Sequence, residues 1–264
     1  MSAVIVSVAE LAAALASPRP PVLLHVGDGA GGLIPGAVPV DLASTLQGVP
    51  SSDSDGRRPL PAVDDLQAHA RSWGISSAST VVVYDGSGGT QAGRAWWVLR
   101  WAGIASVRLL DGGLAAWAAA GRGVTHDVPA PVPGDVTLSP GHLRELDADR
   151  AAEYAGAGRL LDARGPQAFA EGHIPGAISL PTRDNLGHDG RLLDADTLRK
   201  RFAAFDLDDG RPVGVYCGGG VAAAHEAAVL ASLGVDAALF VGSFSAWSGD
   251  PRRPISRTPS PEGS

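Results

Sequence analysis

Short apolar runs alternate along the chain with segments that have helical character. Two stretches, 81–89 and 213–220, each pass from a short strand rich in β-branched residues into a glycine-rich loop. An alanine-rich helical segment follows each loop, at 92–103 and 222–234. Strands that alternate with helices are typical of a mainly parallel sheet covered by helices. The pattern therefore predicts an α/β protein.

The same order of features occurs twice. A short apolar strand and a tryptophan follow each helical segment, and the tryptophans are Trp117 and Trp247. Upstream, Ile-Pro-Gly-Ala occurs at 34–37 and again at 174–177. Asp85 lies 32 positions before Trp117, and Cys217 lies 30 positions before Trp247. Four features in one order at nearly fixed spacing predict a tandem repeat.

The boundaries of the repeat follow from composition. We expect a first domain at 1–127 and a second at 141–255. The proline-rich stretch 128–140 between them predicts an extended linker, mobile relative to a core. The polar, Pro/Ser-rich stretch 256–264 predicts a disordered tail.

Composition narrows the functional class. The 264 residues fit two domains of about 130 residues each. A net charge of −7 argues against nucleic acid or an anionic membrane surface as a partner. No apolar run approaches the roughly 18–20 residues of a spanning helix, and no basic region precedes the N-terminal apolar stretch. The single cysteine, Cys217, excludes an intrachain disulfide and a site of several cysteines around zinc. We expect a cytoplasmic protein without metal or cofactor.

Three motifs carry a resemblance to a known family. They are Leu160-Leu161-Asp162-Ala163-Arg164, Gly172-His173-Ile174-Pro175-Gly176-Ala177 and Val215-Tyr216-Cys217-Gly218-Gly219-Gly220-Val221. In this order they resemble the signatures of the rhodanese family, and the repeat resembles its tandem thiosulfate and 3-mercaptopyruvate sulfurtransferases over about residues 5–255. The resemblance implies two rhodanese-like domains, each a mainly parallel sheet flanked by helices. The first is catalytically silent, since Asp85 stands where a thiol would be needed. The second carries Cys217.

The resemblance also implies a reaction. Sulfane sulfur would pass from thiosulfate or 3-mercaptopyruvate to a thiophilic acceptor through a persulfide on Cys217. The acceptor would be cyanide, a small thiol or thioredoxin. The alternative from another class is a non-catalytic rhodanese-like module that binds a partner or regulates sulfur flow.

The residues around Cys217 support the same site on chemical grounds. A nucleophilic cysteine must react as the thiolate. Loop amides and the start of the following helix place partial positive charge near the sulfur. The glycines of this loop can turn their N–H groups inward, so the loop predicts a cradle for sulfur and an anionic donor. The cradle residues are Cys217, Gly218, Gly219, Gly220, Val221 and Ala222. We expect Gly219 to adopt a backbone conformation closed to β-branched residues; the alternative for Cys217 is a buried structural thiol.

Other cysteine chemistries fit less well. A phosphatase of the Cys-x5-Arg kind needs an arginine six positions after the cysteine, where this chain has Ala223. A cysteine hydrolase needs a nearby histidine base. His225 is predicted about two turns along the next helix, aimed away from the loop.

The chain also departs from the family pattern. Thiosulfate-using members usually have cations in the loop, whereas this loop is uncharged. The mercaptopyruvate-using pattern has serine, threonine, histidine and arginine where this chain has Gly219, Ala222, Leu33 and Ala168. The donor is therefore left open. Arg183 is the candidate donor-binding cation, and its alternatives are an ion pair with Asp184 or a solvated charge.

Overall fold

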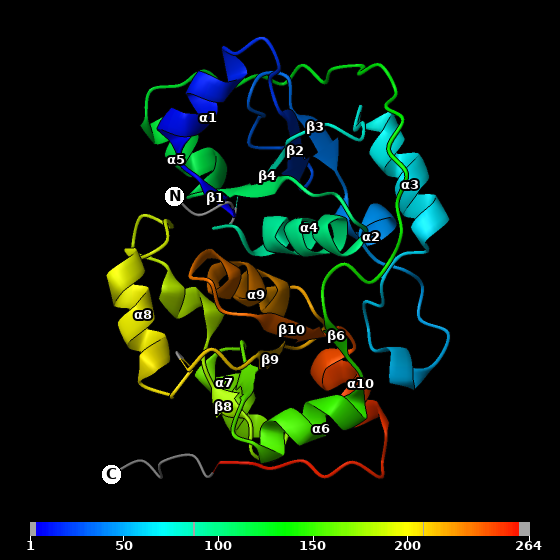
Figure 1. Cartoon of the computed structure of the whole chain (residues 1–264), viewed down its shortest axis with the longest axis vertical. Coiled ribbons are helices and arrows are strands. Elements are labelled where there is room, and N and C mark those ends of the chain that lie inside the picture. Colours follow the sequence, from blue (N-terminus) through cyan, green and yellow to red (C-terminus); the bar gives the residue numbers. More distant parts are fainter. Residues whose placement is uncertain (1–3, 87, 208, 259–264) are drawn as a thin grey trace. The chain divides into compact units, whose positions relative to one another are not determined.

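The computed structural model describes residues 4–86, 88–207 and 209–258, which form two compact units (Figure 1). Unit 1 comprises Met1–Gly48, Leu60–Leu143 and Leu186–Leu192. Unit 2 comprises Val49–Pro59, Arg144–Asn185 and Leu193–Ser264. The predicted domains at 1–127 and 141–255 were uninterrupted, and this is corrected. Unit 1 includes Leu186–Leu192 from the second half of the sequence, and unit 2 includes Val49–Pro59 from the first half.

Unit 1 is built on a five-stranded parallel sheet. Its order is β1-β5-β4-β2-β3. The strands are β1 (Ile5–Val6), β2 (Val22–Val26), β3 (Val38–Val40), β4 (Val81–Tyr84) and β5 (Val107–Leu110). The helices are α1 (Val8–Leu15), α2 (Leu42–Thr45), α3 (Val63–Ser72), α4 (Thr90–Trp101) and α5 (Gly113–Ala119).

Unit 2 repeats this design, with the order β6-β10-β9-β7-β8. Its strands are β6 (Glu145–Leu146), β7 (Leu160–Asp162), β8 (Ile178–Ser179), β9 (Val213–Tyr216) and β10 (Ala237–Phe240). Its helices are α6 (Ala148–Gly156), α7 (Pro166–Glu171), α8 (Ala195–Ala203), α9 (Ala222–Ser232) and α10 (Ser243–Gly249). Two 3-10 helices, η1 (Asp53–Asp55) and η2 (Thr182–Asn185), complete it. The predicted α/β fold of two parallel sheets flanked by helices is confirmed.

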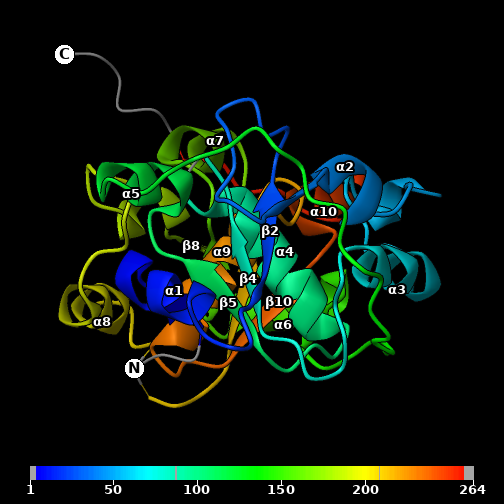
Figure 2. The same cartoon turned by 90° about the horizontal axis from the view of Figure 1, so that it is seen from above.

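Helices cover both faces of each sheet. In unit 1, α1 and α5 lie on one side of β2 and β4, and α3 lies on the other (Figure 1 and Figure 2). Val8, Leu11 and Trp117 of α1 and α5 share one core with Leu23 and Val82 of the strands. The equivalent core of unit 2 joins α6 and α10 to β7, β9 and β10. Burial of these apolar faces stabilises both sheets.

The Ile-Pro-Gly-Ala motifs serve the same purpose in both units. The Ile34 N–H donates to the Tyr84 hydroxyl at 2.9 Å, and the Ile174 N–H donates to the Tyr216 hydroxyl at 3.1 Å. Each tyrosine ends the strand that leads into the glycine-rich loop. In each unit the motif therefore fixes the end of β4 or β9 to the connection that leads into β3 or β8.

The proline-rich stretch 128–140 packs on unit 1 and is not separate from both cores, which corrects the linker prediction. Val136 and Leu138 are buried. The Gly134 N–H donates to the Arg71 carbonyl, and the Leu138 N–H donates to the Gln67 side chain. Burial of the Val136 and Leu138 side chains holds this stretch on unit 1, although its proline content favours an extended backbone.

The predicted tail is also corrected at its start. Ser256 exchanges backbone hydrogen bonds with His173, and the Thr258 N–H donates to the Ala170 carbonyl. Residues 259–264 lie outside the described residues. Within the described part of the chain, no helix has the length and apolar character needed to cross a membrane.

Candidate active site

Cys217 follows β9 directly and opens the loop that leads into α9. The β-branched residues Val213 and Val215 favour the strand, and β9 is buried along its whole length. The Cys217 side chain is buried, and the Gly220 N–H lies 3.1 Å from its Sγ and donates to it. Gly220 has φ +80°, a left-handed conformation open to glycine at little cost. This conformation directs the amide at the sulfur.

The first turn of α10 holds the other side of the loop. The Phe244 N–H donates to the Cys217 carbonyl at 2.9 Å, and the Ser245 N–H donates to the Gly218 carbonyl at 3.1 Å. The Ser243 hydroxyl accepts from the Cys217 N–H at 3.2 Å and donates to the Phe240 carbonyl at 2.9 Å. These four bonds fix the backbone on which the thiol is carried.

Ser243 holds this position in a left-handed conformation, with φ +53°, and is fully buried. Such a conformation costs a residue other than glycine roughly 1–2 kcal/mol. Unit 1 has Gly113 at the equivalent place, also left-handed at φ +55°. Unit 2 therefore has a serine hydroxyl beside Cys217 at the position where unit 1 has Gly113.

The equivalent loop of unit 1 shows what this kind of loop binds. Asp85 follows β4 as Cys217 follows β9, and the Leu114 N–H donates to its carbonyl as Phe244 donates to that of Cys217. The Asp85 carboxylate accepts from the backbone N–H groups of Gly89, Gln91 and Ala92 at 2.8, 2.8 and 2.9 Å. Unit 1 thus surrounds a buried carboxyl group with loop and helix amides. At the equivalent place in unit 2, the Gly220 N–H donates to the Cys217 sulfur.

Positive charge reaches the Cys217 loop from a distant part of the sequence. The segment 49–59 belongs to unit 2 and carries Arg57 and Arg58. A Cβ added at Gly218 would lie 3.0 Å from Arg57 Nη2, and a Cβ added at Gly219 would lie 3.4 Å from Arg58 Nη1. Both guanidinium groups therefore lie against the two glycines that follow the cysteine. Sequence reasoning missed these residues; the only signal was an Arg-Arg pair in a stretch otherwise free of cations.

The predicted site residues have different places in the structure. Gly218, Gly219, Gly220, Val221 and Ala222 form the continuous backbone between Cys217 and the start of α9. The left-handed residue among them is Gly220, which corrects the conformation predicted for Gly219.

Arg183 lies on η2 and is exposed. No hydrogen bond or ion pair joins its side chain to any residue that the structure describes; Asp184 pairs with Arg201 instead. Nothing in the geometry connects Arg183 to Cys217.

A buried polar cluster lies behind the loop and joins α9 to η2. The Thr182 hydroxyl and His225 Nδ1 are 2.8 Å apart, and Asn185 Nδ2 donates to Glu226 Oε2 at 2.7 Å. Arg201 donates to Asn185 Oδ1 at 3.1 Å. Burial raises the pKa of Glu226 from 4.5 to about 7, against the lowering effects of Thr182, Arg201 and Asn185. His225 lies in the first turn of α9 and not two turns along it, and its ring is engaged in this cluster.

Arg164 is likewise engaged. Its guanidinium donates to both Asp162 carboxylate oxygens and to the Gly172 carbonyl, and it stacks 4.2 Å from the Phe244 ring centre. The Asp162 side chain is fully buried. This pair supports the strand end beside Cys217 and leaves little of the guanidinium for a ligand.

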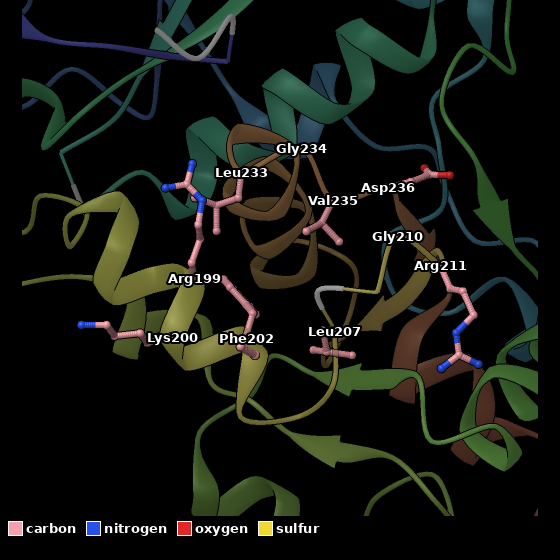
Figure 3. A pocket seen from close by; sticks show the side chains of 11 residues that line it. Arg199, Lys200, Phe202, Leu207, Gly210, Arg211, Leu233, Gly234, Val235 and Asp236 are labelled. Carbon is pink, nitrogen blue, oxygen red and sulfur yellow. The ribbon is translucent and has the colours of Figure 1, made fainter.

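A cavity of about 460 Å³ lies elsewhere in unit 2 (Figure 3). It is lined by residues of α8 and of the connections before β9 and β10, with Phe202, Leu207 and Val235 on its apolar side. Those connections enter the amino ends of the strands, whereas Cys217 leaves the carboxyl end of β9. Ligands of parallel α/β sheets bind at the carboxyl ends. The cavity is therefore not the cysteine site.

Among the described residues, no group of three or more His, Cys, Asp or Glu side chains is placed to hold a metal ion. The residues gathered around the loop are the Cys217 thiol, backbone amides and the two arginines.

Comparison with known proteins decides the family. The model of the rhodanese-like domain matches residues 25–120 and again 145–250. The chain belongs to the rhodanese family.

Similar rhodaneses are named for sulfur transfer. A putative thiosulfate sulfurtransferase, SseB of Mycobacterium tuberculosis, is 44% identical over 240 residues, covering 86% of this chain and 84% of the relative. A probable 3-mercaptopyruvate sulfurtransferase of Pseudomonas aeruginosa is 41% identical over 238 residues, covering 84% and 83%. The crystal structure of SseA from Escherichia coli, a 3-mercaptopyruvate enzyme, matches with a TM-score of 0.78 at 25% identity, over 90% of this chain and 98% of that one. This tandem rhodanese is a sulfurtransferase.

Proposed function

We propose that Cys217 carries the transferred sulfur as a persulfide. The observation that carries this proposal is the bond from the Gly220 N–H to Cys217 Sγ, in a loop whose counterpart binds the Asp85 carboxylate through three backbone amides. An environment that stabilises a carboxylate also stabilises a thiolate and the terminal sulfur of a persulfide. The buried structural thiol is the weaker interpretation, because a neutral thiol needs no such amides.

Each donor would load Cys217 by one displacement at sulfur. With thiosulfate, the Cys217 thiolate attacks the outer sulfur, the S–S bond breaks, and sulfite leaves with the bonding electron pair. With 3-mercaptopyruvate, the C–S bond breaks, and the carbon keeps the electron pair and takes the thiol proton to give pyruvate. In discharge, a thiophilic acceptor attacks the outer sulfur of the persulfide and the Cys217 thiolate is restored.

The donors proposed are thiosulfate and 3-mercaptopyruvate, which the names of the relatives support. The proposed acceptors are cyanide, a small thiol or thioredoxin. Residues 218–222 would surround the transferred sulfur with backbone, and Arg183 remains a proposed but unsupported contact for the donor.

The test is steady-state sulfur transfer to cyanide, measured as thiocyanate, with each donor in turn. Wild type should turn over with at least one donor, and Cys217→Ser should show none while it unfolds at the same temperature as wild type. Turnover by Cys217→Ser would place the chemistry elsewhere. A folded wild type without turnover for either donor would favour the non-catalytic binding module.

A further inference from the structure

The loop after Cys217 has no charged side chain between residues 217 and 222, yet both proposed donors are anions. The charge comes from the segment 49–59, which belongs to unit 2. We infer that Arg57 and Arg58 bind the oxyanion of the sulfur donor and thereby restrict the enzyme to anionic donors. This inference rests on the proposed function, since it concerns the donor that loads Cys217.

The arginines and the glycines fit each other sterically. A Cβ at Gly218 would lie 3.0 Å from Arg57 Nη2, tighter than an ordinary van der Waals contact. At Gly219 the added atom would lie 3.4 Å from Arg58 Nη1 and 3.9 Å from Arg57 Nε. The two guanidinium groups can lie directly against the loop because Gly218 and Gly219 have no side chains. A Cβ at Gly218 would require the Arg57 guanidinium to shift by a few tenths of an ångström, whereas a Cβ at Gly219 would make an ordinary van der Waals contact with Arg58.

The backbone of Arg57 is also tied to the loop. The Arg57 N–H donates to the Ser245 hydroxyl at 3.0 Å, and the Ser245 N–H donates to the Gly218 carbonyl at 3.1 Å. One serine thus sets the distance between the arginine segment and the residue next to the thiol. Unit 1 has Ala115 where this serine occurs in the repeat.

Gly56, just before the arginines, allows the segment to approach. It is buried, has φ +71°, and an added Cβ would lie 2.4 Å from the Gly242 carbonyl oxygen. Asp55 closes the preceding turn by accepting from the backbone N–H groups of Ser51 and Ser52. The segment is therefore a fitted part of unit 2, although most of unit 2 lies more than 80 residues away in the sequence.

The charge of Arg57 is available to a ligand. Its side chain is exposed, and within the described part of the chain it makes no ion pair with a carboxylate. Guanidinium groups bind carboxylate and sulfonate oxygens through paired N–H donors. The sulfonate of thiosulfate and the carboxylate of 3-mercaptopyruvate share this chemistry, and either would be drawn over Gly218 and Gly219 with the donor sulfur toward Cys217.

The test compares Arg57→Gln, Arg58→Gln and the double variant in the full chain. Arg199→Gln is the matched control, since Arg199 pairs with Asp196 on α8 and lines the cavity at the other end of the sheet. A charge-assisted hydrogen bond is worth about tenfold or more in binding, so each single variant should raise KM about tenfold and the double variant about a hundredfold. The value of kcat should change little, because the oxyanion is bound in ground and transition states alike. Arg199→Gln should match wild type.

The two donors are tested in separate arms. A rise in KM for thiosulfate alone would assign the pair to a sulfonate, a rise for 3-mercaptopyruvate alone to a carboxylate, and a rise for both to the shared anion; each supports the inference. Unchanged KM for both donors in the double variant would overturn it.

A second measurement does not depend on turnover. Because Cys217 is the only cysteine, its alkylation by iodoacetate and by neutral iodoacetamide can be compared directly. The double variant should lose about tenfold in the iodoacetate rate with the iodoacetamide rate unchanged. Equal loss with both reagents would show that the arginines only support the loop, and no loss would overturn the inference. If wild type shows no sulfur transfer while the charge selectivity holds, the proposed function fails and the anion site stands.

Discussion

Replacing Glu226 by glutamine should change how the stability of unit 2 depends on pH. Glu226 is fully buried on α9, its Oε2 accepts from Asn185, and its Oε1 has no hydrogen-bond partner among the described residues. Burial raises the pKa of this carboxyl from 4.5 to about 7. The folded protein therefore binds a proton that the unfolded chain has already released across this range.

The sign and size follow from proton linkage. A raised pKa contributes stability that is fully present below about pH 4.5 and is lost as the pH rises through about 7. The difference between these values corresponds to a loss of about 3 kcal/mol in unfolding free energy. Glutamine keeps an acceptor for Asn185 and cannot ionise. Glu226→Gln should therefore lie within about 1 kcal/mol of wild type at about pH 5 and exceed it by up to about 3 kcal/mol at about pH 8.

Urea unfolding at these two pH values is the assay. The control is Glu153→Gln, an exposed residue of α6 whose ion pair with Arg150 is worth about 1 kcal/mol or less. It should retain the wild-type pH dependence. If Glu226→Gln also retains that dependence, the carboxyl is not the buried group that the structure shows, and the reasoning fails.

Three further substitutions test the loop and its counterpart. Gly220→Ala should abolish persulfide loading and lower the unfolding free energy by about 1–2 kcal/mol, because alanine disfavours φ +80°. Thermal unfolding of this variant is compared with that of Gly219→Ala, and an equal loss of stability in the two variants would contradict the prediction. Ser243→Gly should slow loading without loss of stability, because it removes the hydroxyl at the Cys217 N–H and relieves the left-handed serine; unchanged single-turnover loading would show that the hydroxyl has no positioning role. Asp85→Asn should destabilise unit 1 by about 1–3 kcal/mol, since one amide group would face backbone donors, yet leave sulfur transfer intact; loss of transfer in the folded variant would contradict the silent role.

Much of the fold could be predicted from local pattern. The strand–loop–helix unit around Cys217 is contiguous in sequence, and its β-branched strand and alanine-rich helix specify it locally. The equivalent unit around Asp85 made the repeat visible. Local pattern could not show which glycine turns left-handed, since Gly218, Gly219 and Gly220 are identical residues. The bonds from Phe244 and Ser245 to the loop carbonyls and the Gly220 amide at Sγ decide that in three dimensions.

The donor-binding charge could not be predicted because it depends on distant parts of the chain. Arg57 lies 160 positions before Cys217, in the half that has Asp85 in place of the cysteine. The loop looked uncharged, and Arg183 was chosen as the candidate because it follows the Ile-Pro-Gly-Ala motif at 174–177. The prediction of a mobile linker was wrong for a related reason. Val136 and Leu138 are two apolar residues in a proline-rich stretch, and their burial depends on the surface of unit 1, which the local sequence does not show.

Intact-mass spectrometry of the full chain after exposure to thiosulfate or 3-mercaptopyruvate tests the central claim most directly. Wild type should gain the mass of one sulfur atom, lose it on addition of cyanide, and Cys217→Ser should gain nothing. A folded wild type that gains no sulfur from either donor, or an equal gain on Cys217→Ser, would contradict the persulfide account.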